Sequence, residues 1–121
     1  MAVTAVATGT GSQLTVLTTE HDLMTAASAG GIGNGVYVLM VDLSPMINGD
    51  VVELRIYSRI NTSLGEKLAY YAVYAHVQAQ PNKYSVPIPS LGGSGTDTLH
   101  FTIKQTAGTV HTYFYRTVTV G

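Results

Sequence analysis

The sequence contains no cysteine and few charged residues. Without cysteine, the 121-residue chain can form no disulfide, no thiolate metal site and no cysteine nucleophile. Only 11% of its residues are charged, against about 25% in typical soluble domains. Because a monomer needs surface charge to stay soluble, we expect the chain to bury part of its surface against other subunits. The alternative is a monomer with a neutral surface, since sixteen threonines could cover the outside of a sheet.

Basic residues and long apolar runs are also scarce. The six Lys and Arg residues are scattered and the net charge is −1, so we expect no binding to nucleic acid. No stretch approaches the ~18 consecutive apolar residues of a membrane helix, so we expect no membrane contact. The N-terminus has neither the basic start nor the apolar run of a signal peptide. Hydrophobic residues make up 45% of the chain, which is enough for one folded domain.

Helical periodicity is nearly absent, and apolar residues alternate with a period of two from residue 12 onward. The alternation predicts strands at 13–18, 36–43, 51–60, 66–77, 83–89, 97–105 and 110–120. Only 18–28 has helix-capping residues, and we expect one short helical turn there. The sequence therefore predicts an all-β fold, a single antiparallel β-sandwich or jelly-roll-like domain of about seven to eight strands over 12–121. An extended N-terminal arm at 1–11 would precede it.

The stretch LAYYAVYA (68–75) raises the question of whether its three tyrosines form a binding surface. A hairpin through NTSLG (61–65) places it beside VVELRIYSRI (51–60). We predict four cross-strand pairs: Val52–Tyr74, Leu54–Ala72, Arg55–Tyr71 and Ile56–Tyr70. In this register Tyr70 and Tyr74 belong to the core, where they meet aliphatic partners. Tyr71 points the other way and stacks on Arg55 as a cation–π pair.

The motifs of enzymes and metal sites are weak or missing. The four histidines lie on separate predicted elements, and a hairpin around 107–108 would place His111 opposite Lys104. Asp50 and Asp97 follow turns and could serve a calcium site, although turn-starting Asp is much commoner. No GxSxG motif occurs. A glycosidase with two carboxylates stays open as an alternative, because its acids need only meet in space. We expect no cofactor, no metal and no enzymatic activity.

Candidate contact residues lie in the arm, one glycine-rich loop and the last strand. Tyr113 and Tyr115 share one face of the last strand, and we expect that face to contact another subunit. Core packing and stacking on a sugar ring are the alternatives. The remaining candidates for subunit contacts are Ala2, Val3, Thr4 and Val6 in the arm, and Gly31, Ile32 and Asn34 in the loop.

Over about residues 35–110, the ordered segments VDLS, GDVVELRIY, LAY, VPIP and KQTAG resemble small β-rich proteins encoded among the virion genes of tailed bacteriophages. This resemblance carries no catalytic motif. It implies a non-enzymatic structural protein that decorates or cements the capsid exterior and is assembled in the host cytoplasm. Its partners would be the major capsid protein or other virion subunits, and it would form a homo-oligomer such as a trimer. The alternative is a glycan-binding or tail-adhesion module using exposed Tyr with Asn82 or Asp97.

Overall fold

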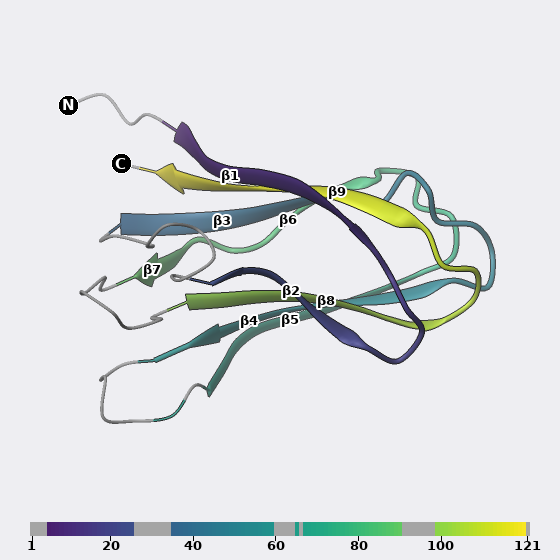
Figure 1. Cartoon of the computed structure of the whole chain (residues 1–121). Coiled ribbons are helices and arrows are strands. Elements are labelled where there is room, and N and C mark those ends of the chain that lie inside the picture. The colour runs from purple at the N-terminus through teal and green to yellow at the C-terminus, as the bar shows by residue number, and fades with distance from the viewer. Residues whose placement is uncertain (1–4, 26–34, 60–64, 66, 91–98, 121) are drawn as a thin grey trace.

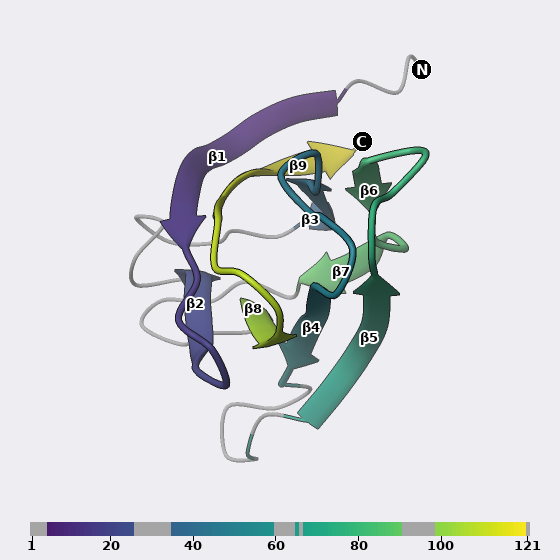
Figure 2. The same cartoon turned by 90° about the vertical axis from the view of Figure 1, so that its right-hand side faces the viewer.

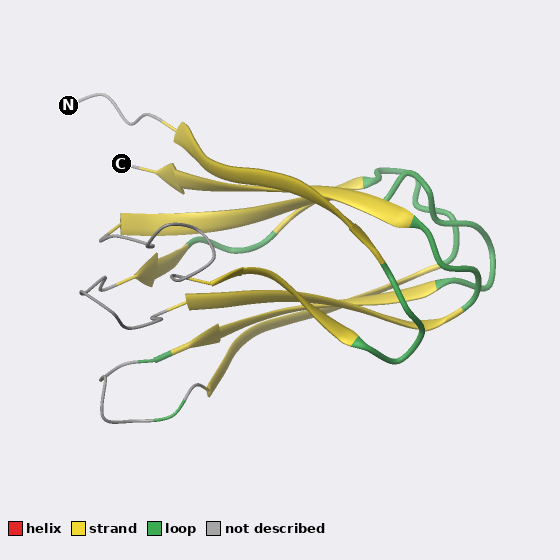
Figure 3. Ribbon diagram, viewed as in Figure 1, coloured by secondary structure: helices red, strands yellow, loops and turns green. Residues whose placement is uncertain are grey.

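The strands of this protein form two antiparallel sheets that face each other (Figures 1 and 2). The structure is a computed structural model that describes residues 5–25, 35–59, 65, 67–90 and 99–120. These residues form strands and loops and contain no helix (Figure 3). The strands are β1 (Ala5–Leu14), β2 (Glu20–Thr25), β3 (Gly35–Asp42), β4 (Val51–Ser58), β5 (Lys67–Ala75), β6 (Asn82–Tyr84), β7 (Ile88–Ser90), β8 (Leu99–Ala107) and β9 (Thr112–Val120).

Each sheet is assembled from strands that are distant in the sequence. The sheet we call sheet A has the order β1-β9-β3-β6, and β7 also pairs with β3. The sheet we call sheet B has the order β2-β8-β4-β5. The predicted all-β antiparallel sandwich is thereby confirmed. The expected edge position of 83–89 is confirmed too, since β6 and β7 are three-residue strands beside β3 and prolines interrupt the segment.

The core lies between the two sheets and is filled by alternate side chains of β3, β4 and β8. The core residues of these three strands are Tyr37, Leu39, Val41, Val52, Leu54, Ile56, Leu99, Phe101 and Ile103. Each such side chain stabilises the fold by about 1.5–3 kcal/mol through its removal from water. The four predicted pairs between β4 and β5 are all present. Arg55 also lies over the Tyr71 ring, 4.7 Å from its centroid, as predicted.

Two expectations for the N-terminal part were wrong in their details. Residues 5–11 of the predicted arm belong to β1, which pairs with β9 along its length, while residues 1–4 lie outside the described part. In residues 18–25, the described part of the expected helical turn at 18–28, no helical turn forms: a turn at 17–18 is followed by β2, which pairs with β8. Residues 26–28 lie outside the described part. Pairing in the sheet buries Leu23 against the core, and this burial outweighs the weak local preference for a helix.

The predicted hairpin between 97–105 and 110–120 does not form. β8 lies in sheet B and β9 lies in sheet A, so the connection between them crosses from one sheet to the other. Gly108 makes this turn with a positive φ of 91°, and the Gln105 side chain donates to the carbonyls of Ala107 and Thr109. Lys104 consequently pairs with Glu53 of β4 rather than lying opposite His111.

Candidate binding face on the outside of sheet A

The outward side of sheet A presents two rows of side chains that cross its strands. In the first row, Phe114 of β9 lies between Ser12 of β1 and Asp42 of β3, and Asn82 of β6 follows Asp42. In the second row, Arg116 lies next to Met40, and Tyr84 follows Met40. Strand alternation creates this face, because the neighbouring residues of β9 point inward. We call these seven residues the sheet A face: Ser12, Met40, Asp42, Asn82, Tyr84, Phe114 and Arg116.

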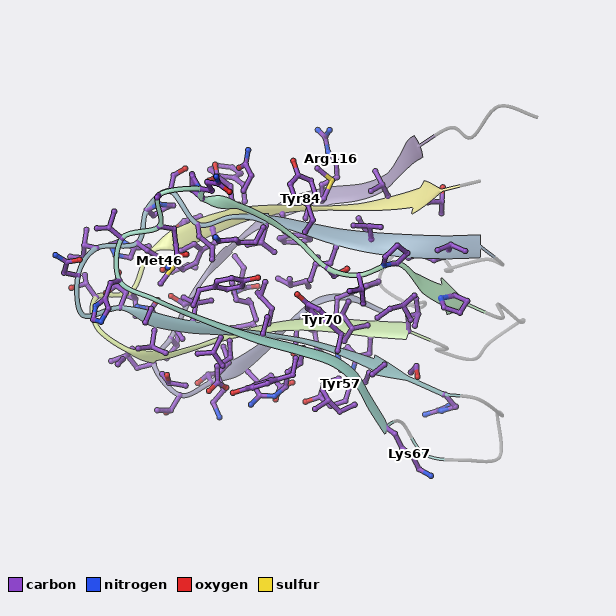
Figure 4. The ribbon with its side chains drawn as sticks, turned by 180° about the vertical axis from the view of Figure 1, so that it is seen from behind. Met46, Tyr57, Lys67, Tyr70, Tyr84 and Arg116 are labelled. Atoms are coloured by element: carbon purple, nitrogen blue, oxygen red, sulfur yellow. The ribbon has the colours of Figure 1, made fainter. Side chains whose placement is uncertain are left out.

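The aromatic members of the sheet A face are strongly exposed. Phe114 is 64% exposed and Tyr84 is 57% exposed. Figure 4 shows the side chains of Tyr84 and Arg116 directed away from the core, whereas Tyr70 points between the sheets. A groove of about 450 Å³ runs over this part of the sheet, and Phe114 and Arg116 help to line it. The face therefore offers a partner an apolar ring beside a cation in a shallow depression.

The polar members of the sheet A face have free hydrogen-bonding capacity. The Oδ1 atom of Asp42 accepts from the backbone N–H of Ser44, at 2.9 Å, and from its hydroxyl. Within the described residues, the side chains of Ser12, Asn82 and Arg116 make no hydrogen bond or ion pair with the protein. The groove thus carries a carboxylate, an amide, a hydroxyl and a guanidinium around one exposed aromatic ring.

The two tyrosines predicted as surface contacts point inward instead. Tyr113 is 1% exposed, and its hydroxyl donates to Oε1 of Gln105 at 3.4 Å. Tyr115 is partly buried against the core and donates to the carbonyl of Leu23 at 2.9 Å. The Tyr115 side chain passes close to Gly11. A Cβ atom added at Gly11 would lie 2.6 Å from the hydroxyl oxygen of Tyr115. The expectation that Tyr113 and Tyr115 form an outward contact was therefore wrong, and Phe114 between them occupies the outward position.

The other predicted contacts are mostly outside the described residues. Ala2, Val3 and Thr4 precede β1, and Gly31, Ile32 and Asn34 fall in the undescribed stretch 26–34. Val6 lies in β1, where it pairs with Thr119, and its side chain is not described. Asn82, named for the glycan alternative, does lie in the groove, whereas Asp97 is outside the described part.

The outward side of sheet B differs because its charged side chains pair with one another. Glu20, Lys104 and Glu53 lie in one cross-strand row of alternating sign. Arg55 forms an ion pair with Glu53 at 2.7 Å. Burial disfavours the charged form of Glu20, but hydrogen bonds from Tyr57 and Thr102 and the nearby cations outweigh it and lower its pKa. Charges on this side of the protein therefore lie beside charges of opposite sign.

Asp50 is a buried carboxylate that holds loops together at one end of the sandwich. It is 0% exposed and accepts hydrogen bonds from the backbone N–H of Ile47 at 2.9 Å and of Thr109 at 2.8 Å. Nε2 of His111 lies 2.8 Å from Oδ2 of Asp50, the same oxygen that accepts from Ile47. Burial raises the pKa of Asp50, but these hydrogen bonds outweigh burial and lower it overall. Among the described residues, no three His, Asp or Glu side chains gather into a metal-binding group.

Comparison with known proteins gives no relative. The sequence matches no protein-family model, no curated protein and no solved structure. In the part of the chain that the structure describes, no helix has the length and apolar character to cross a membrane.

Proposed function

We propose that this protein is a non-enzymatic structural subunit of a bacteriophage virion, which decorates or cements the capsid by binding other virion subunits through the sheet A face. The assignment to a virion rests on the sequence resemblance over residues 35–110. The structural observation that supports a binding role is the exposure of Phe114 and Tyr84 beside Met40 and Arg116.

The composition of the sheet A face suits a protein–protein contact. Aromatic residues, Met and Arg are enriched at protein interfaces, and Lys, Glu and Asp are depleted. Tyr and Arg are also frequent among the few residues that carry most of the binding energy. The sheet A face has two aromatic rings, one Met and one Arg, whereas sheet B presents Glu20, Glu53 and Lys104. We therefore assign sheet A to the partner and the charged side of sheet B to solvent.

A decorating subunit of this kind would act through binding equilibria. A protein that binds the assembled shell but not its dissociated parts stabilises the shell by mass action. Contacts with two neighbouring subunits at once would raise the apparent affinity further, because the second contact forms at a high effective concentration. No chemical step is required of the protein in this role.

The test is co-sedimentation of the purified protein with capsids of the phage that encodes it. Replacement of the outward ring in Phe114→Ser is expected to raise the Kd for capsids at least tenfold, a cost of at least about 1.4 kcal/mol. Val77→Ser provides a matched control, because Val77 is 60% exposed and lies outside the sheet A face. Equal binding of Phe114→Ser and the wild type would refute the proposed face. Absence of the chain from purified virions would refute the virion assignment.

A second candidate function is glycan binding in the groove. The exposed ring of Phe114 could stack on the apolar face of a sugar, while Asp42, Asn82 and Arg116 hydrogen-bond its hydroxyl groups. Screening on a glycan array distinguishes the two functions. Sugar binding that is lost in both Phe114→Ala and Asn82→Ala, with unchanged capsid binding, would favour the glycan function over the subunit function.

A further inference from the structure

The strands at the four sheet edges of the sandwich differ in how well they are protected. Exposed edges are usually blunted by charge, proline, bulges or shortness, since an open edge can pair with another chain. β2 carries Glu20 and Asp22, and β6 and β7 are three residues long with Pro89 in the latter. β1 has a bulge between Ala7 and Gly9 and bends around the side of the molecule toward β2 (Figure 2).

β5 has a bulge only near its start, between Leu68 and Tyr70, and its remaining residues 70–75 have none of these protections. It is nine residues long, contains no proline or glycine and pairs only with β4 among the described strands. Its single charged residue is Lys67 at its start, so residues 68–75 are entirely uncharged. Its outward side chains are apolar and exposed, with Leu68 at 53%, Tyr71 at 47% and Val73 at 46%. Long, uncharged and apolar edges of this kind pair with other strands.

We infer that β5 pairs antiparallel with β5 of a second copy of this chain, so that the two B sheets join into one continuous sheet around a two-fold axis. The best register places Ala72 opposite Ala72 of the other copy. Tyr71 then lies opposite Val73 on the outer side in both halves of the contact. An aromatic residue opposite a β-branched one is a favourable cross-strand pair. On the inner side, Tyr70 lies opposite Tyr74.

A second copy fits this edge better than an arbitrary strand because the edge is self-complementary. Two-fold pairing repeats the same aromatic and β-branched contact on both sides of the axis, as isologous interfaces require. The register also separates the two Lys67 residues by ten residues along the strand direction, which is about 34 Å, so the only charges of β5 do not repel. The sheet A face is not part of this contact and stays available in both copies.

The first test is the mass of the purified protein by size-exclusion chromatography with light scattering. The wild type is expected at about 26 kDa, twice the chain mass of 12.8 kDa. Val73→Lys inserts a charge at the centre of the edge and is expected to weaken the dimer at least tenfold, which leaves mostly monomer. Val16→Lys adds the same charge at a 55% exposed valine between β1 and β2, outside β5, and is expected to remain dimeric. A monomeric wild type, or a dimer unaffected by Val73→Lys, would overturn the inference.

Spin labels test the register and do not depend on a destabilising substitution. Because the chain has no cysteine, Val73→Cys and Lys67→Cys each give one labelled site per copy. In the proposed dimer the backbone separation between copies is ~8 Å at residue 73 and ~35 Å at residue 67. Similar distances at the two sites, or a longer one at 73, would overturn the inference. Both tests use isolated protein, so their failure leaves the capsid-binding proposal intact, and failure of capsid binding leaves the dimer intact.

Discussion

Replacement of Asp50 by alanine is expected to be among the most damaging single changes in this protein. The Asp50 carboxylate joins the turn before β4 to the crossing between β8 and β9 through its bonds to Ile47, Thr109 and His111. Asp50→Ala leaves two backbone N–H groups and the His111 ring without this acceptor. The carbonyl of Asp50, which accepts from the N–H of His76 at 2.8 Å, is retained.

The expected loss follows from the three hydrogen bonds to a charged acceptor. Such bonds contribute about 1.5–3 kcal/mol each. The donors lie near the surface, where water can replace part of each bond, so we take the lower end and expect a loss of about 3–5 kcal/mol at neutral pH. A domain of this length has a free energy of unfolding of about 6–18 kcal/mol, so the variant should still fold. Asp50→Asn keeps one side-chain oxygen acceptor and is expected to lose roughly half as much.

The same carboxylate predicts how stability depends on pH. The pKa of Asp50 is lowered from its ordinary 3.8 in the folded protein. Its contribution is therefore complete above the unfolded pKa near 4 and is lost as the pH falls through the lower folded value. Urea unfolding of wild type and Asp50→Ala at pH 7 and at successively lower pH measures this directly. The difference in free energy of unfolding should shrink below about pH 4.

Asp42→Ala is the matched control for Asp50→Ala. Asp42 accepts hydrogen bonds only from nearby Ser44 among the described residues, so its replacement is expected to change the free energy of unfolding by less than ~1 kcal/mol. A loss below ~1 kcal/mol for Asp50→Ala at pH 7, or a difference that persists unchanged in acid, would refute the role given to Asp50.

Three further outcomes follow from the structure. Gly108→Ala should lower the free energy of unfolding by more than ~2 kcal/mol in thermal melts, because the added Cβ would lie 2.6 Å from Cα of Asp50. Gly49→Ala is the control, since Gly49 also has a positive φ but has open space around it, and should cost only ~1 kcal/mol. Equal losses in the two variants would contradict the close contact at Gly108. Tyr113→Ala should cost about 3–5 kcal/mol in urea unfolding through the cavity it leaves, and a loss below ~1 kcal/mol would show that the ring is not in the core. Burial raises the pKa of Tyr113 and of Tyr70 to about 12, so an ultraviolet titration should show tyrosine ionisation that continues well above pH 10. The stabilising effect of these two raised pKa values is full below pH 10 and is lost as the pH rises through 12. Complete ionisation of the tyrosines near pH 10, in a protein that stays folded, would contradict the burial of these two rings.

The sequence predicted those parts of the fold that depend on local pattern. The alternation in β4 and β5 and the short connection between them determine the register, and the Arg55–Tyr71 pair follows from it. The partners of β8 and β9 could not be predicted in this way. Both strands have an apolar inner side and a glycine turn between them, which suits a hairpin and a crossing between sheets equally well. Pairing with strands distant in the sequence decides the outcome.

The sheet A face was missed because of the aromatic run in the last strand. Tyr113, Phe114 and Tyr115 are consecutive, so each side of the strand carries an aromatic residue and alternation alone does not show which side is buried. The weak signal that could have identified the outward side is Arg116, which shares it with Phe114. Tyr84 and Met40 join the face only through the pairing of β3 with β6, which no local pattern reveals.

Hydroxyl-radical footprinting of the protein, free and bound to capsids of its phage, tests the central claim most directly. The method reports which side chains lose contact with water on binding. We expect strong protection of Phe114, Tyr84 and Met40 on sheet A and unchanged reactivity of Tyr57 on the opposite side of the sandwich (Figure 4). Unchanged reactivity at Phe114 and Tyr84 in the bound protein, or protection confined to sheet B, would contradict the proposed binding face.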